Sequence, residues 1–191
     1  MQTHLFCDLR QPIVVSDGLG VDSMAMLVGM RRRGIRPDAI LHADVGGEKD
    51  ETVAYLPIAN RYLAQHDFPQ ITVVRYVPQD FKNWPPYYTL EENCLTNGTL
   101  PSISFGFQKK SCSQKWKAAP QHAWVKAWPL AQEYWNAGGK VLKVIGYDAS
   151  PRDQNRQTYA RDPNRIKDGH LYDYWYADCH RGPMDHRQHT T

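Results

Sequence analysis

A glycine-rich turn carries the residues in this chain that are best suited to chemistry. Residues 16–23 read Ser-Asp-Gly-Leu-Gly-Val-Asp-Ser and lie between a short apolar run and an amphipathic stretch. Backbone N–H groups at the start of a helix are unpaired, and the helix dipole favours negative charge there. Glycine allows a phosphate to approach the backbone closely, and Ser16 and Ser23 add hydroxyl donors. The pattern predicts a phosphate-binding turn, and the plainer alternative is a strand-to-helix turn capped by Asp22.

Two well-known nucleotide motifs can be compared with this turn. A Walker A loop requires Gly-Lys followed by Ser or Thr, and the turn contains no Lys, so that motif is excluded. A dinucleotide-binding Gly-x-Gly-x-x-Gly motif matches at two glycines, because Ser23 stands at the third position. Asp44 lies about 20 residues further on, after a second apolar run, where such proteins place an acid that binds ribose. A nicotinamide- or flavin-dependent oxidoreductase is therefore one prediction.

Four segments together resemble a different family. Residues 20–23, Gly-Val-Asp-Ser, resemble the second half of the Ser-Gly-Gly-x-Asp-Ser signature of PP-loop ATP pyrophosphatases. Residues 42–52, 110–120 and 145–156 are similar to elements of the phosphoadenosine phosphosulfate (PAPS) reductase branch of that superfamily. They read His-Ala-Asp-Val-Gly-Gly-Glu-Lys-Asp-Glu-Thr, Lys-Ser-Cys-Ser-Gln-Lys-Trp-Lys-Ala-Ala-Pro and Ile-Gly-Tyr-Asp-Ala-Ser-Pro-Arg-Asp-Gln-Asn-Arg. The segments occur in the order of the family, and the chain resembles its phage-borne members.

The resemblance implies an adenine nucleotide alpha-hydrolase-like, Rossmann-like fold and an enzyme that acts on ATP or PAPS. The reaction would take place at the α-phosphate or at the sulfonyl group, and Mg²⁺ would be held by Asp22. The implied catalytic residues are Asp22, Ser23, Lys117 and Arg156. The implied nucleotide-binding residues are Ser16, Gly18, Gly20, Asp44, Gly46, Lys115, Gly146 and Arg152. The acceptor substrate is not identified by the sequence.

A reductase would also need a thiolate that attacks sulfur, and a thiol donor such as thioredoxin. Cys112 and Cys179 are the candidate nucleophiles. Lysines at 109, 110, 115 and 117 surround Cys112 in the sequence and create an electropositive setting that favours a thiolate. The alternative interpretation of Cys112 is a small buried hydrophobic residue.

The chain departs from the family pattern in two places. Gly18-Leu19 replaces the leading Ser-Gly of the signature, and a bulky residue is strained if the turn requires a positive φ there. Near the C-terminus only residues 178–180, Asp-Cys-His, resemble the cysteine-bearing tail of the reductases. We expect residues 177–191 to form a disordered tail. We also expect the C-terminal end to be truncated or frame-shifted relative to the family. A catalytically inactive nucleotide-binding protein is a further alternative.

Predicted strands and helices alternate along the chain, and these elements must position the residues described above. Strands are expected at residues 13–16, 39–43, 71–77 and 140–147, and helices at about 22–34 and 50–67, the second interrupted at Pro57. Such alternation predicts an α/β fold with a doubly wound, mostly parallel sheet and helices on both faces. These sheets bind ligands at the carboxyl ends of their strands, where strand order reverses. Each of the motifs above follows a predicted strand.

Two other segments have no predicted part in catalysis. Residues 78–111 are rich in Pro, Asn and Gly and are expected to form a ligand cover or a partner surface. Trp124, Trp128 and Trp135 recur with Ala131 at helical spacing, which predicts core packing. Stacking on single-stranded nucleic acid is the alternative for these tryptophans, so a nucleic-acid partner stays open.

Composition predicts a single globular domain over residues 1–176. The chain has 191 residues, of which 41% are hydrophobic and 23% charged, and no apolar run approaches the roughly 18 residues of a membrane span. The four cysteines are scattered, and no leader pattern is visible, so a reduced, cytoplasmic protein is expected. Residues 1–100 hold 9 Lys and Arg against 12 Asp and Glu, whereas residues 101–191 hold 14 against 8. This asymmetry suggests an anionic ligand between the two halves, and homo-oligomerisation stays open.

Overall fold

Five parallel strands form the centre of the molecule in the part of the chain that the computed structural model describes, residues 10–81, 83–100, 112–148, 150–151, 154–155 and 168–178. The strands are β1 (Ile13–Asp17), β2 (Ala39–Asp44), β3 (Ile71–Arg75), β4 (Val141–Tyr147) and β5 (Tyr172–Asp178). The helices are α1 (Val21–Arg32), α2 (Asp50–Ala64), α3 (Leu90–Asn97), the π-helix η1 (Ser113–Ala118), α4 (Ala119–Ala127) and α5 (Pro129–Asn136). No helix in these ranges is both long enough and apolar enough to cross a membrane.

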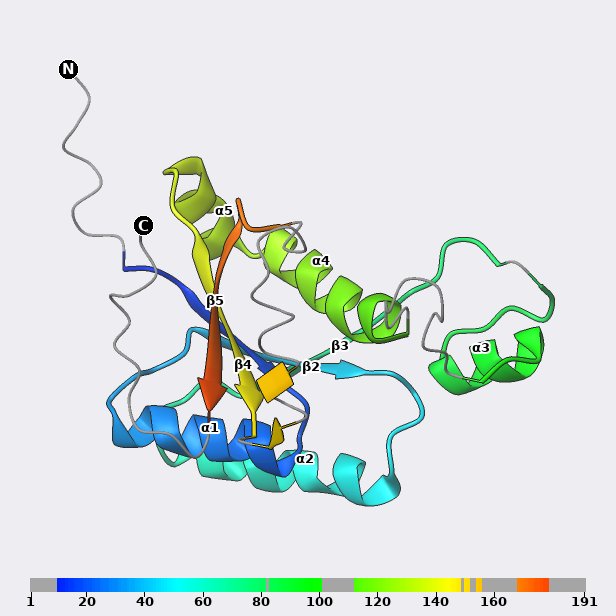
Figure 1. Ribbon diagram of the computed structural model, residues 1–191, viewed down its shortest axis with the longest axis horizontal. Coiled ribbons are helices and arrows are strands. Elements are labelled where there is room, and N and C mark those ends of the chain that lie inside the picture. Colours follow the sequence, from blue (N-terminus) through cyan, green and yellow to red (C-terminus); the bar gives the residue numbers. More distant parts are fainter. Residues whose placement is uncertain are drawn as a thin grey trace.

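The strand order is β3-β2-β1-β4-β5, and every neighbouring pair is parallel. The chain therefore winds outward from β1 in one direction through β2 and β3, and in the other through β4 and β5. The connections between the strands place α1 and α2 on one face of the sheet and α4 and α5 on the other (Figure 1). The prediction of a doubly wound α/β fold is confirmed. Strand order reverses between β1 and β4, so their carboxyl ends mark the switch point.

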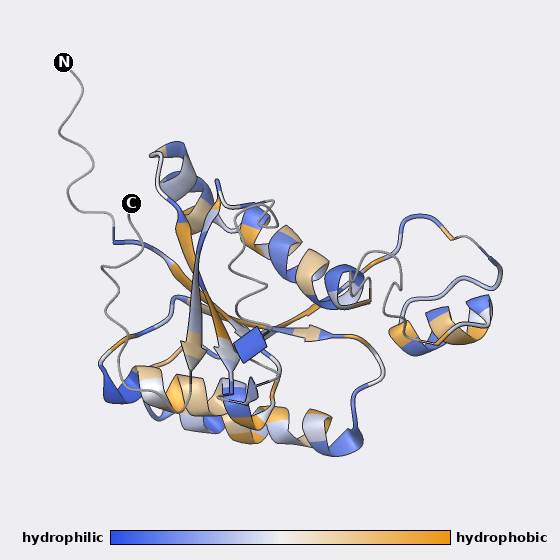
Figure 2. Cartoon of the chain, in the orientation of Figure 1, coloured by the Kyte–Doolittle hydropathy of each residue, from blue (hydrophilic) through white to orange (hydrophobic). Residues whose placement is uncertain are grey.

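Alternation along each strand divides the core into two apolar layers. Val14 and Val15 are fully buried on opposite faces of β1. Val15 packs with Leu27 of α1 and with the rest of the α1–α2 layer, whereas Val14 packs with Val125 of α4. Figure 2 shows apolar residues along the central strands and mixed colouring on the helices that cover them. Burial on both faces explains why these strands read as apolar runs in the sequence.

The second helix differs from its prediction. α2 is continuous from Asp50 to Ala64, so the expected interruption at Pro57 was wrong. A proline cannot donate to the carbonyl four residues earlier, here that of Val53. Pro57 is exposed and the Val53 side chain is 60% exposed, so water can bind the freed carbonyl. The helix tolerates the proline because it faces solvent.

The tryptophan segment forms two helices instead of one. α4 ends at Ala127, and Trp128 is extended because Pro129 follows it and begins α5. Trp124, Trp128 and Trp135 pack against the apolar layer of the α4–α5 face. Core packing is therefore confirmed for these residues, although they do not share one helix face.

The excursion after β3 contains a helix that was not predicted from the sequence. Thr89 and Glu92 form a capping box at the start of α3, and Gly98 ends the helix in the left-handed conformation. α3 stands apart from the layers that cover the sheet (Figure 1). β5 was also missed, and it continues to Asp178, past the expected domain boundary at 176. Residues 101–111, and the tail from 179 onward, lie outside the described part.

Candidate functional site

The turn after β1 holds a strained residue whose side chain faces the core. Leu19 has a φ of 54°, a left-handed conformation that residues with a Cβ rarely adopt. Its side chain is only 8% exposed and packs with the α1–α2 layer, which includes Met24 and Leu27. The sequence-based expectation of strain at Leu19 is therefore confirmed. Because its side chain is buried, Leu19 does not fill the outer side of the turn.

Two glycines form the outer rim of the turn. A Cβ added to Gly18 or to Gly20 would meet no atom within 4 Å, and both residues are exposed. Gly20 is the N-cap of α1 and has an extended conformation, and no side chain caps the helix there. The first helical hydrogen bond runs from Met24 N–H to the Gly20 carbonyl, at 3.1 Å. The N–H groups of the first turn of α1 therefore lack helical partners beside an open rim, a geometry suited to an anion.

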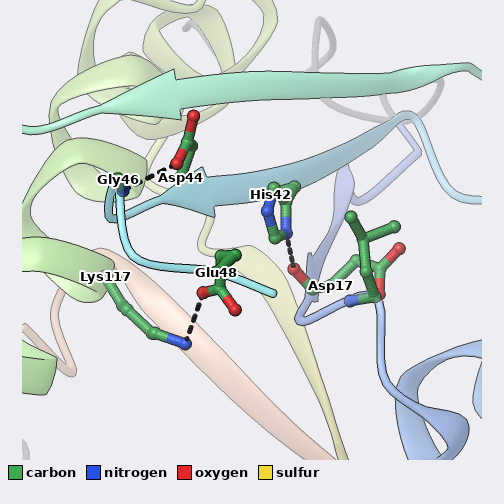
Figure 3. A network of polar contacts seen from close by, with 7 residues as sticks. Asp17, His42, Asp44, Gly46, Glu48 and Lys117 are labelled. Atoms are coloured by element: carbon green, nitrogen blue, oxygen red, sulfur yellow. Dashed lines mark hydrogen bonds and ion pairs between the residues drawn. The ribbon is translucent and has the colours of Figure 1, made fainter. Parts of the chain in front are cut away.

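Asp17 lies beneath this rim and was not predicted as a site residue. Its side chain is 2% exposed, and its Oδ1 accepts the Leu19 N–H at 2.8 Å. Its Oδ2 is buried and has no hydrogen-bond partner among the described residues. His42, 5% exposed on β2, places Nδ1 3.1 Å from the Asp17 carbonyl oxygen (Figure 3). A buried acceptor without a partner is costly, so Asp17 is a candidate for contact with a bound cation or donor.

The hydroxyl groups of the two serines of the turn each donate a hydrogen bond to another group of the protein. Ser16 donates to Gln121 Oε1 of α4 at 2.6 Å, on the sheet face opposite α1. Ser23 donates to the Gly20 carbonyl at 3.1 Å. A phosphate contact from either serine would require the hydroxyl to change partner. Their predicted roles in nucleotide binding therefore stay predictions, and Ser16 is the less favourably placed.

Gly146 of β4 sets the position of the start of α1. A Cβ at this residue would lie 3.1 Å from the Asp22 carbonyl oxygen and 3.2 Å from Ser23 Cα. A side chain at this position would press on the backbone of α1, so the glycine favours the close approach of the first turn of α1 to β4. Gly146 therefore helps to hold the start of α1 at the switch point, and this role does not depend on a direct contact between Gly146 and a ligand.

The end of β2 carries a second polar group at the same edge of the sheet. Asp44 Oδ1 accepts the Gly46 N–H at 2.8 Å, and Oδ2 accepts from Arg75 Nε at 2.9 Å and also pairs with Nη2. Partial burial alone would raise the pKa of Asp44, but the Gly46 N–H and the Arg75 guanidinium outweigh it and lower the pKa. Arg75, at the end of β3, was not predicted as a site residue. The parallel register that pairs Asp44 with Arg75 is what brings them together.

Replacing Arg75 with methionine tests this ion pair. Arg75 is 71% exposed, so we expect the free energy of unfolding to fall by at most about 1 kcal/mol at neutral pH. Since the folded pKa of Asp44 is depressed, the contribution is complete above its usual 3.8 and is lost as pH falls through the folded value. Urea unfolding from neutral pH down to about pH 3 should show the two proteins converging. A constant difference on acidification would contradict the assignment.

Lys117 brings the basic half of the chain to the loop after β2. Its Nζ lies 3.3 Å from Glu48 Oε1, and the two side chains point toward one another beside the end of β2 (Figure 3). Lys117 is 51% exposed, so its ammonium remains accessible to an additional anion. It lies in η1, and π-helical turns are frequent at functional sites. The long-range approach of residue 117 to the switch-point edge was expected only from the resemblance.

Lys115 is placed differently from Lys117. Its Nζ lies 5.2 Å from the ring centre of Tyr76, and 5.3 Å from those of Tyr87 and Trp116. These cation–π contacts hold the ammonium in an aromatic cluster. To contact a nucleotide as predicted, the Lys115 ammonium would have to leave these cation–π contacts.

Arg152, Arg156 and Cys179 lie outside the described residues. Cys112 is described, and it lies half-buried against the aromatic cluster that also holds Trp116. Among the described residues, no group of three or more His, Cys, Asp or Glu side chains is arranged to hold a metal ion.

The fold and the turn define the class of this protein. It is an α/β protein with a doubly wound parallel sheet, and its glycine turn and uncapped helix start lie at the switch point. Comparisons of the chain with protein-family models, curated proteins and solved structures found no match.

Proposed function

We propose that the protein binds an adenine nucleotide, ATP or PAPS, at the turn over residues 16–23. The observation that carries this proposal is the open rim of Gly18 and Gly20 beside the uncapped start of α1. Phosphates bind at such helix starts through backbone N–H groups. The resemblance of the sequence to PAPS reductases supports an adenine nucleotide as the ligand.

The proposed reaction is at the α-phosphate or at the sulfonyl group, and it relies on positioning and charge. Lys117 is accessible at the edge of the site and would neutralise negative charge on the phosphates. Arg152 and Arg156 are assigned the same role by the resemblance. Mg²⁺ takes one or two carboxylates together with phosphate oxygens and water. Asp22, with the unpartnered oxygen of Asp17 in the same turn, fits that donor set and would offset the ligand's negative charge.

Two chemistries are distinguishable within this proposal. An ATP-using enzyme would release pyrophosphate, whereas a PAPS reductase would release sulfite in the presence of a thiol donor such as thioredoxin. The nicotinamide or flavin alternative requires Asp44 to accept ribose hydroxyls. Asp44 has the same neighbours, Gly46 and Arg75, under either reading, so the affinities for NAD, ATP and PAPS distinguish the two.

The test fills the rim without changing the core. Because a Cβ at Gly18 meets no other atom, Gly18→Val should fold normally and weaken binding of ATP or PAPS at least about tenfold. Gly47→Val is the matched control, since Gly47 has equally open surroundings and lies outside the turn. Calorimetric titration with ATP, PAPS and NAD, each with Mg²⁺, measures the affinities. If neither ATP nor PAPS binds, or if Gly18→Val binds as the unmodified protein does, the proposal is wrong.

A further inference from the structure

One face of α2 carries apolar side chains that the described residues leave exposed. α2 covers one face of the sheet (Figure 1), and its inner side packs there through the buried Ala59 and Leu63. On the opposite side of the helix, Ala54 and Pro57 are exposed and Ile58 is 56% exposed. Residues three or four apart adjoin on a helix, so these three side chains form one apolar surface. Such a surface is typical of a contact with another protein.

The exposed residues of this face have the spacing of a helix that packs along another helix. Residues 51, 54, 58 and 61 are separated by three, four and three positions, and all four are exposed. This is the spacing of positions a and d in a coiled coil, which line one side of the helix. We call these residues, Glu51, Ala54, Ile58 and Arg61, the α2 seam. The seam is apolar at its centre and carries opposite charges at its two ends.

The two charges of the α2 seam are not paired within the described part of the chain. Neither Glu51 nor Arg61 belongs to any of the ion pairs found there. Ten positions separate them, which is about 15 Å along an α-helix, so they do not reach one another. An acid and a base are therefore presented on one surface at a fixed separation.

A second copy of this helix, packed antiparallel, satisfies both charges at once. Positions 51 and 61 lie five residues on either side of position 56, and positions 54 and 58 lie two residues on either side of it. A two-fold axis near position 56 therefore brings Glu51 of each copy to Arg61 of the other. The same axis sets Ile58 of each copy against the small Ala54 of the other. Any other partner would have to match this order of charges, whereas a second copy carries it already.

We propose that the chain forms a symmetric homodimer in which the α2 seams of two copies pack antiparallel. Ala54 and Ile58 provide the apolar contact, and the two pairs of Glu51 with Arg61 fix the direction and register of the helices. One helix face per copy is a small interface, so we expect a dissociation constant in the micromolar range. The seam contains no residue of the turn over 16–23, so each copy keeps its own proposed nucleotide site.

Reversal of the two charges on separate chains tests the pairing. Glu51→Arg sets like charges against each other at both ends of the seam, and so does Arg61→Glu, so each variant alone should dimerise at least about tenfold more weakly than the unmodified chain. An equimolar mixture of the two variants restores both pairs of opposite charge and should form a heterodimer. Sedimentation equilibrium of the unmodified chain, each variant and the mixture measures the association. An unmodified chain that is monomeric throughout the micromolar range would overturn the proposal, and so would a mixture that associates no better than its components.

The mixture also separates pairing from effects on the helix itself. Glu51 near the start of α2 and Arg61 near its end both suit the dipole of their own helix, so each reversal also weakens that helix. This effect acts within one chain, and mixing does not relieve it. Circular dichroism of each variant shows whether it is folded before the chains are mixed.

Ile58→Asp tests the apolar centre of the seam. Because Ile58 is exposed, this variant should keep the unfolding transition of the unmodified chain but sediment as a monomer. Leu95→Asp is the matched control, since Leu95 is 75% exposed on α3, and it should dimerise as the unmodified chain does. If Leu95→Asp is monomeric and Ile58→Asp is a dimer, α3 forms the contact and the proposal is wrong. No nucleotide is present in these measurements, so their outcome is independent of the proposed nucleotide binding.

Discussion

Replacing Leu19 with alanine is expected to lower the free energy of unfolding by about 2–4 kcal/mol. The side chain is 8% exposed and packs with the layer between the sheet and α1. Alanine removes most of that contact but keeps a Cβ at a residue whose φ is 54°. The variant therefore loses the packing without relief of the backbone strain. Urea unfolding followed by circular dichroism measures the change.

Leu19→Gly is the matched variant that separates strain from packing. It loses the same side chain, but glycine adopts a positive φ without a steric cost. We expect Leu19→Gly to be about 1 kcal/mol more stable than Leu19→Ala, the reverse of the usual order of these residues. A less stable glycine variant would show that the left-handed conformation of the turn is wrong. Both variants should still bind ATP if the rim of Gly18 and Gly20 is the anion site.

Replacing Gly146 with alanine is expected to disturb both stability and ligand binding. The new methyl would lie 3.1–3.3 Å from backbone atoms of Asp22 and Ser23, which cannot move without displacing the start of α1. Overpacking of this kind costs about 1–3 kcal/mol. Since the same displacement moves the N–H groups of the helix start, we expect ATP affinity to fall at least about tenfold.

Gly47→Ala is the control for this substitution. Gly47 lies in the loop after β2, and a Cβ there would meet no atom within 4 Å. This variant should match the unmodified protein in unfolding free energy and in ATP affinity, each measured by urea unfolding and calorimetry. If Gly146→Ala behaves like Gly47→Ala, the contact of α1 with β4 does not position the turn.

The apolar strands and the glycine turn could be predicted from the local sequence. β1, β2 and β4 consist largely of aliphatic residues because both faces are covered, and this composition gave their positions to within one or two residues. β5 was missed because its sequence is Tyr-Asp-Tyr-Trp-Tyr-Ala-Asp, whose apolar surface is aromatic and whose hydropathy is low (Figure 2). The burial of Tyr172 and Tyr176 depends on their neighbours in the folded sheet.

Residue types and local spacing determined the class of fold, the position of the glycine turn and the strain at Leu19. Only the tertiary structure decided that the Leu19 side chain enters the core, and that Asp17 keeps a buried oxygen without a described partner. It also decided that Arg75 pairs with Asp44, through the parallel register of β2 and β3. The physical reason is that turns and strands are specified by a few neighbouring residues. Contacts between side chains far apart in the chain depend on sheet register and helix packing, which arise only when the whole domain folds.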